Sequence, residues 1–206
     1  KQDGSYFENK FLYSLDYDTR DKKYQTSGGL RSVFSQAIPL ISDDYAFSNS
    51  YEITKWHQFD NAMIADINFY GKAINSIQNK DVRVSNRLGL PATRLRGFES
   101  GKLGPVDGTD YIGGNYAAAL NISTTIPMFL QNFESIDLRY FVDVGNVWGV
   151  DYSDTIDDSN TIRSSTGLGV NWFTPIGPMN FSFIQNLSKA KSDKVESFQF
   201  NIGTSF

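Results

Sequence analysis

Four consecutive residues, Leu95-Arg96-Gly97-Phe98, place a guanidinium group, a permissive backbone position and an aromatic side chain next to one another. A guanidinium group holds a carboxylate through two parallel hydrogen bonds, and such a pair would fix this segment to another part of the fold. Asp143 is a candidate partner, since it stands two residues after Phe141 in a segment of alternating apolar and polar residues. Without that partner, the tetrapeptide is an ordinary solvated turn with an incidental arginine.

Other chemistries find less support in the residue pattern. The only histidine, His57, falls at an expected short turn and has no nucleophile motif around it. An acidic stretch lacks the spacing and the glycine of an EF-hand, so we interpret it as a solvated loop. It contains Asp151, Asp154, Asp157 and Asp158. We therefore predict no catalytic residues, no metal site and no cofactor.

The composition narrows the class of protein. The chain has 206 residues, a net charge of −4, no cysteine and 15% aromatic residues. Lysine and arginine are scattered among acidic residues, so we expect no nucleic-acid partner. The absence of cysteine excludes a disulfide scaffold and thiolate metal ligands. No apolar run approaches the roughly 18 residues that a membrane-spanning helix needs.

An alternation of apolar and polar side chains with a period of two recurs along the chain, as expected of β-strands with two different faces. In the last segment one face carries Phe198, Phe200, Ile202, Thr204 and Phe206, and the other carries small or polar residues. The sequence therefore predicts an all-β chain of about nine strands. The segments are 7–18, 30–38, 45–57, 62–71, 115–126, 135–148, 163–173, 179–186 and 196–206.

The length of these segments favours a membrane barrel. Most have about 9 to 13 residues, which suits a tilted strand that crosses a bilayer, whereas soluble strands average about five or six. A bacterial barrel has an even number of strands, and an open sheet in lipid leaves backbone groups unpaired. We therefore expect residues 1–206 to be the C-terminal part of a transmembrane antiparallel up-and-down β-barrel whose N-terminal strands and periplasmic modules are absent here.

The connections between the segments predict an orientation. Tight ones, 57–61 and 174–178, are interleaved with longer polar ones, 149–162 and 186–195. Barrels place short turns on the periplasmic side, so the C-terminus is expected there. The long connection of about residues 72–114 is then extracellular, and a loop of that length normally has a function.

Several motifs resemble, in order, those of the BamA-type assembly factors of the outer-membrane protein-assembly superfamily. The loop motif of that family is valine or isoleucine followed by arginine, glycine and phenylalanine, and Leu95 is a mild departure from it. The resemblance covers essentially the whole chain and is most specific from residue 93 onward. The matching segments are 95–98, 113–115, 141–148, 175–178 and 198–203.

The resemblance implies roles for individual residues. In the family, the loop arginine contacts acidic residues on the inner barrel wall, and one of them corresponds to Asp143, near Phe141. The position of a second family acid, a glutamate, is occupied by Ser123, which leaves Arg96 with one identifiable carboxylate. Residues of the last strand also resemble the signal by which the insertion machinery recognises outer-membrane proteins. These are Phe198, Phe200, Gly203 and Phe206.

The resemblance also implies a function. It points to a barrel of about sixteen strands in the bacterial outer membrane that inserts other β-barrel proteins without nucleotide or metal. Its partners would be the lipid bilayer, unfolded outer-membrane protein clients and the lipoproteins of an assembly complex. We hypothesise that the seam between the absent first strand and residues 196–206 is weakly paired and templates client strands. An exporter or autotransporter assembly factor of the same superfamily and a passive porin remain alternatives.

Overall fold

The computed structural model describes residues 5–23, 25–60, 62–77, 80–126, 135–156, 161–175 and 177–202. Helical structure in these ranges amounts to one 3-10 turn, η1 (Val84–Asn86). None of the described residues belongs to a helix that is long and apolar enough to cross a membrane. The strands are β1 (Glu8–Asp18), β2 (Gly29–Ser42), β3 (Ala46–Gln58), β4 (Ile64–Ser76), β5 (Val106–Asp107), β6 (Asp110–Tyr111), β7 (Tyr116–Thr125), β8 (Ile136–Trp148), β9 (Arg163–Thr174), β10 (Gly177–Ser188) and β11 (Phe198–Ile202).

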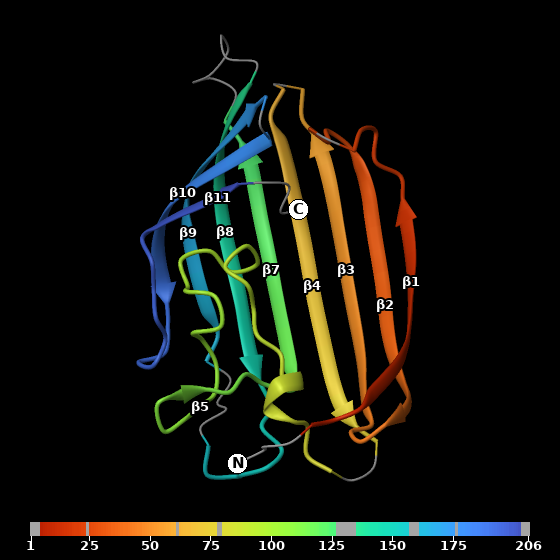
Figure 1. Cartoon of the computed structure of the whole chain (residues 1–206). Helices are drawn as coiled ribbons and strands as arrows, with labels where there is room; N and C mark the ends of the chain where they lie inside the picture. Colours follow the sequence, from red (N-terminus) through yellow and green to blue (C-terminus); the bar gives the residue numbers. More distant parts are fainter. Residues whose placement is uncertain are drawn as a thin grey trace.

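Nine of these strands form one antiparallel sheet in the order β1-β2-β3-β4-β7-β8-β9-β10-β11. Apart from the edge strands β1 and β11, which have one neighbour each, every strand of this sheet pairs with the strands before and after it in the sheet order, which is the up-and-down order of a barrel wall. The short β5-β6 hairpin lies in the long connection between β4 and β7 (Figure 1). This sheet confirms the all-β, antiparallel up-and-down fold class. Among the described residues β1 and β11 do not pair with each other, so the barrel is not closed within this chain.

The two faces of the sheet differ as the alternation predicts. On β8, Phe141 and Asp143 are fully buried on the face that the long connection covers, whereas Tyr140 is 45% exposed on the opposite face. We call the covered side the inner face and the other side the outer face. Phe183 and Leu168, also on the outer face, are 58% and 43% exposed. An apolar outer face combined with a polar inner face is typical of a strand that faces lipid on one side.

The long connection between β4 and β7 lies across the inner face, where Figure 1 shows it as a yellow-green trace in front of the sheet. Its apolar side chains pack onto those of the strands and form the largest buried cluster. This packing stabilises the position of the connection through the apolar surface that it removes from water. The cluster comprises Ala46, Ile74, Val82, Leu88, Leu90, Leu95, Phe98, Leu103, Ala117, Ala119 and Val147.

Two strands, β4 and β2, extend several residues past their expected C-terminal ends. The expected loop 72–114 begins later, because β4 continues to Ser76 and pairs with β3 as far as Ala46. Polar side chains hide the alternation there, although Ile74 is buried. Strand β2 likewise continues to Ser42, past Pro39. A proline is tolerated in a strand at an irregularity, and Pro39 lies beside the register shift of β1.

The lengths of the connections alternate less strictly than predicted. The turn after β3 and the turn after β9 are short, as expected, and lie at the same end of the sheet. However, residues 43–45, which join β2 to β3, form a short turn at the end where the long loops lie. Residues 19–28, which join β1 to β2, form a longer connection at the end of the short turns.

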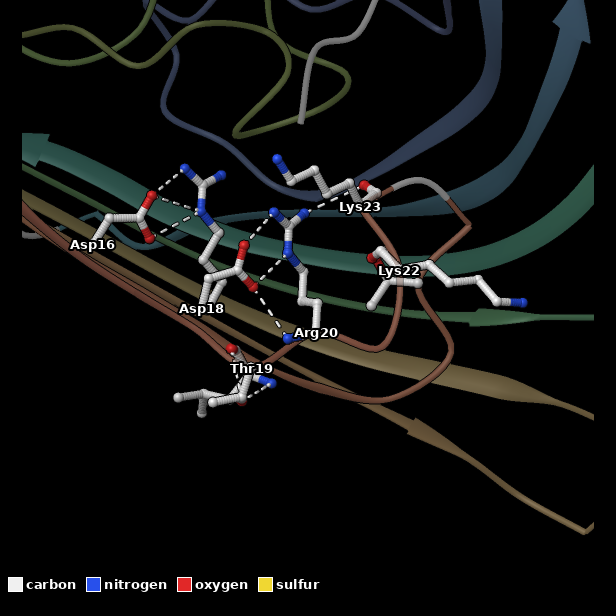
Figure 2. A network of polar contacts seen from close by, with 9 residues as sticks. Asp16, Asp18, Thr19, Arg20, Lys22 and Lys23 are labelled. Atoms are coloured by element: carbon white, nitrogen blue, oxygen red, sulfur yellow. Dashed lines mark hydrogen bonds and ion pairs between the residues drawn. The ribbon is translucent and has the colours of Figure 1, made fainter.

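An ion-paired network stabilises the connection 19–28 (Figure 2). Arg20 Nε and Nη2 donate to the two carboxylate oxygens of Asp18, at 2.9 and 2.7 Å. The Asp21 carboxylate accepts hydrogen bonds from the Ser27 side chain and from the Gly28 amide, which lower its pKa to about 2. These contacts explain why a polar segment of this length has a defined conformation at the end of β1.

Close packing between β8 and β9 depends on one glycine. Phe141 on β8 and Gly167 on β9 are partners in the sheet register. A Cβ atom at position 167 would lie 2.8 Å from Phe141 Cζ and would overlap the carbonyl oxygen of Phe183 on β10. Gly167 therefore leaves the space that the Phe141 ring occupies on the inner face.

We expect Gly167→Ala to destabilise the barrel by about 1 to 3 kcal/mol, because the added methyl group forces Phe141 or β10 to move. Gly169→Ala is the matched control, since the nearest atoms to its Cβ would be 3.9 and 4.0 Å away. The measurement is urea unfolding of the full-length barrel in detergent, monitored by the heat-modifiable migration of the folded barrel on gels. Equal stability of the two variants would contradict this account of β8-β9 packing.

Candidate functional site

The candidate site is the part of the long connection that spans residues 94–98, which we call the loop segment. Leu95 and Phe98 are completely buried, and both belong to the apolar cluster on the inner face. Their side chains hold the loop segment against the strands. The polar groups between them are thereby brought to the barrel wall, away from bulk water.

Arg96 and Asp143 meet as the sequence pattern suggested. Arg96 Nε donates to Asp143 Oδ2 at 2.6 Å and Nη2 donates to Oδ1 at 2.7 Å, which is a bidentate pair. The Arg96 backbone amide adds a hydrogen bond of 3.2 Å to Oδ2, and Asn121 Nδ2 donates to Oδ1 at 2.8 Å. Asp143 is fully buried, so these four donors compensate a carboxylate that has lost all contact with water.

The ring of Phe141 also contacts the guanidinium group of Arg96. The guanidinium carbon of Arg96 lies 3.5 Å from the centroid of the Phe141 ring, which is a cation–π geometry. Phe141 is itself fully buried and stands two residues before Asp143 on the inner face of β8. One strand therefore supplies both the carboxylate and the aromatic surface for Arg96.

Gly97 permits the turn that follows Arg96. Its φ of +87° lies in the left-handed region that favours glycine. A Cβ atom there would also lie 2.6 Å from Ile184 Cγ2 and 2.9 Å from Asn186 Nδ2. Both the backbone conformation and the space beside β10 therefore require glycine at this position.

The backbone carbonyl groups of the loop segment accept hydrogen bonds from the strands in succession. Irregular backbone inside a protein is stable only when its polar groups find partners. Here polar side chains of four different strands supply the donors. The contacts are Asn121 of β7 to the Arg94 carbonyl (2.8 Å), Ser165 of β9 to that of Arg96 (2.6 Å), Asn186 of β10 to that of Gly97 (2.8 Å) and Gln199 of β11 to that of Phe98 (3.2 Å).

Ser123 does not join this group. It is buried on the inner face of β7, but its hydroxyl donates to Asp66 Oδ1 on β4 at 2.7 Å, its partner in the sheet register. Asp66 in turn pairs with Arg139 of β8. Ser123 therefore lies on the inner wall, but its hydroxyl bonds to Asp66 and not to Arg96 in the described structure.

A second arginine, Arg94, has a role that the sequence pattern does not reveal. Its guanidinium group forms a bidentate pair with Glu52 of β3, at 2.6 and 2.7 Å, and donates to Asn68 of β4 at 3.2 Å. Two features of the sequence hint at this pair. One is the Arg-x-Arg spacing at the loop motif, and the other is a glutamate among the polar inner-face positions of residues 45–57. Neither feature identifies the partner without the strand register.

The last strand presents its aromatic residues to the outer face. Phe198 and Phe200 pack on Phe183 and Phe181 of β10, with ring centroids 5.3 and 4.9 Å apart. Gly203 and Phe206, the other two positions of the predicted C-terminal signal, lie outside the described residues. Their role stays a prediction.

In the acidic stretch interpreted above as a solvated loop, Asp151 is paired with neighbouring residues, whereas Asp157 and Asp158 lie outside the described residues. Asp151 accepts hydrogen bonds from the Val82 amide and the Asn115 side chain and forms an ion pair with Arg87. Burial by itself raises the pKa of the Asp151 carboxyl, but these partners outweigh it and lower the pKa below its ordinary value. Among the described residues no cluster of three or more histidine, aspartate or glutamate side chains has the arrangement of a metal site.

We expect Arg96→Ala to lower the free energy of unfolding by about 3 to 5 kcal/mol, since it leaves the fully buried Asp143 carboxylate without its cation. Arg96→Glu should be at least as damaging, and adding Asp143→Arg should recover part of the loss. The measurement is urea unfolding of the full-length barrel in detergent. If the double reversal recovers nothing, direct pairing of the two side chains is not what stabilises the loop segment.

Comparison with protein families gives a match over the entire chain. The profile described as the Omp85 superfamily domain matches residues 1–206. One relative is the outer membrane protein assembly factor BamA of Neisseria meningitidis serogroup B, which is 30% identical over 166 residues. That match covers 68% of this chain and 19% of the relative.

A second relative of the same name, from Neorickettsia risticii, is 30% identical over 151 residues, covering 72% of this chain and 20% of the relative. The chain thus spans about a fifth of the length of these two proteins. Among solved structures, the crystal structure of BamA from Haemophilus ducreyi lacking POTRA domains 1–3 matches with a TM-score of 0.84 and 23% identity. It aligns with 93% of this chain and 41% of that one, and so supports the barrel-wall fold. Taken with the full-length family match, these findings show that the chain belongs to the Omp85 superfamily of outer-membrane β-barrel proteins.

Proposed function

We propose that the full-length protein assembles and inserts β-barrel proteins into the bacterial outer membrane, without enzymatic chemistry, through a lateral seam that includes β11. The names of the two relatives support the activity, because both are outer membrane protein assembly factors. The chain covers only part of each relative, so the activity of the whole protein is a proposal. Its free energy would come from folding of the client, since strand pairing and burial in lipid are themselves favourable.

The observation that supports the proposal is the position of β11 at the edge of the sheet. In the described residues β11 pairs with β10 between Met179 and Phe183. Its other edge has no strand partner among the described residues. An edge strand with free backbone groups is a template for another strand.

The loop segment is coupled to that strand from inside. Gln199 Nε2 of β11 donates to the Phe98 carbonyl, and Phe98 forms a β-bridge with Val195 in the turn that precedes β11. The Glu196 amide also donates to the Gly97 carbonyl at 3.0 Å. We infer that the docked loop segment holds β11 in place until a client strand competes for its free edge.

The same proposal assigns an orientation and partners. The end of the sheet with the turns after β3 and β9 would face the periplasm, and the connection between β4 and β7 would open toward the exterior. Clients and assembly-complex lipoproteins would approach from the periplasmic side. Phe198 and Phe200 would serve both as lipid-facing residues and as part of the signal for assembly of the protein itself.

Site-specific photo-cross-linking tests the seam. A photoreactive residue at Phe198 should capture a client arrested during assembly, because a client strand paired to β11 would lie about 5 Å away. Leu168 on β9 is the matched control. It lies in the same cross-strand row, is 43% exposed against 49% for Phe198, and stands two strands from the edge. Equal capture at both positions, or none at Phe198 while clients still fold, would rule out the seam at β11.

A passive porin is the alternative from a different class of protein. The position of the loop segment across the inner face disfavours it, because a porin needs an open lumen. We expect the full-length barrel in planar bilayers to give only small and infrequent currents. Large stable currents through the wild-type protein would favour the porin. An exporter of the same superfamily would be distinguished by the modules encoded upstream of Lys1.

A further inference from the structure

The most unusual contact of the loop segment is the one made by Arg94. Its two Nη atoms face the two carboxylate oxygens of Glu52, and Nη1 also donates to the Asn68 side chain. The Tyr70 ring lies 4.8 Å from its guanidinium carbon. Asn68 is oriented by further hydrogen bonds to Glu52 and to Thr54, at 3.0 and 2.6 Å. This is a preorganised guanidinium site built by β3 and β4.

The two arginines of the loop segment reach in opposite directions along the sheet. Arg94 contacts β3 and β4, whereas Arg96 contacts β8. Asn121 of β7 stands between them, since its Nδ2 atom donates to the Arg94 carbonyl and to Asp143 Oδ1, both at 2.8 Å. The two pairs therefore share one bridging side chain and hold the loop segment from both sides.

Ion pairs tie the loop segment to the wall at two places. Arg96 pairs with Asp143 of β8, and Arg94 pairs with Glu52 of β3. Ser123 offers neither arginine a carboxylate, and its hydroxyl donates to Asp66, which pairs with Arg139. Arg94 and Glu52 therefore anchor the loop segment on the side of the sheet that Arg96 does not reach.

We propose that Arg94 is a second positioning residue, which clamps the loop segment to Glu52 and so fixes the side of the segment that the Arg96–Asp143 pair does not reach. The proposal rests on the assembly function, because it assigns to this clamp the same task of holding the docked loop. The side chains of the pair are 22% and 28% exposed. A simple ion pair with that exposure contributes little, so its effect must come from the bidentate geometry and from Asn68.

The test uses the full-length protein, with hydrogen–deuterium exchange of the amides in residues 94–103 as the first measurement. The second measurement is the rate at which a model β-barrel client folds into vesicles that contain the protein. The variants are Arg94→Glu, Glu52→Arg and their combination, with the milder Arg94→Gln and Glu52→Gln in case a reversal fails to fold. Arg20→Gln is the control, because the side-chain hydrogen bonds of Arg20 in the described structure go to Asp18 and Lys23, outside the long connection.

We expect each single reversal to accelerate exchange in residues 94–103 by about tenfold or more, which matches the loss of one charge-assisted pair. The combined variant should return exchange to within about threefold of the wild type. A further variant, Arg94→Lys, should exchange at a rate between those of the wild type and Arg94→Glu, because an ammonium cannot bond bidentately. Arg20→Gln should leave the exchange of residues 94–103 unchanged. Client folding should slow in the single variants and recover in the combination.

Two outcomes would overturn the clamp. One is unchanged exchange of residues 94–103 in Arg94→Glu and Arg94→Gln, and the other is a combined variant no better than the single ones. A wild-type protein that fails to accelerate client folding would instead contradict the assembly function, and the exchange data would still decide the clamp. The two failures are therefore distinguishable.

Discussion

A fully buried carboxylate determines the arrangement of the inner face. Asp143 has no contact with solvent and depends on Arg96 for its countercharge. A buried charge without its partner is costly by several kcal/mol, so the loop that carries Arg96 must enter the barrel and stay there. The other features of the segment follow from this requirement. Gly97 lets the backbone pass close to β10, and Phe98 forms a β-bridge with Val195, just before β11.

The docked loop also determines which polar side chains the strands must supply. Its carbonyl groups are removed from water, and successive strands present one polar side chain each to satisfy them, from Asn121 to Gln199. Removal of the loop would expose those groups and the apolar cluster together. The loop and the strands from β7 to β11 therefore behave as one structural unit. In the proposed function, this unit keeps β11 in register until a client strand arrives.

Sequence reasoning recovers the parts of this structure that depend on local periodicity. The nine strands follow from alternation, and the sheet order follows from their sequence order. Pairing of Arg96 with Asp143 was also predictable, since one motif and one face of a strand suffice to suggest it. The Arg94–Glu52 pair and the true partner of Ser123 were not predictable, because they depend on which residues of β3, β4 and β7 lie opposite one another. Register is a tertiary property that the pattern of a single strand does not contain.

A distance measurement inside the barrel tests the central claim, that the loop segment has one docked position, most directly. The chain contains no cysteine, so spin labels can be introduced at Ser100 in the loop and at Gln58 at the end of β3. Pulsed electron paramagnetic resonance on the full-length protein without client should give one narrow distance distribution. A broad or bimodal distribution would contradict the account, because it would mean that the contacts of Arg94 and Arg96 do not hold the loop in place.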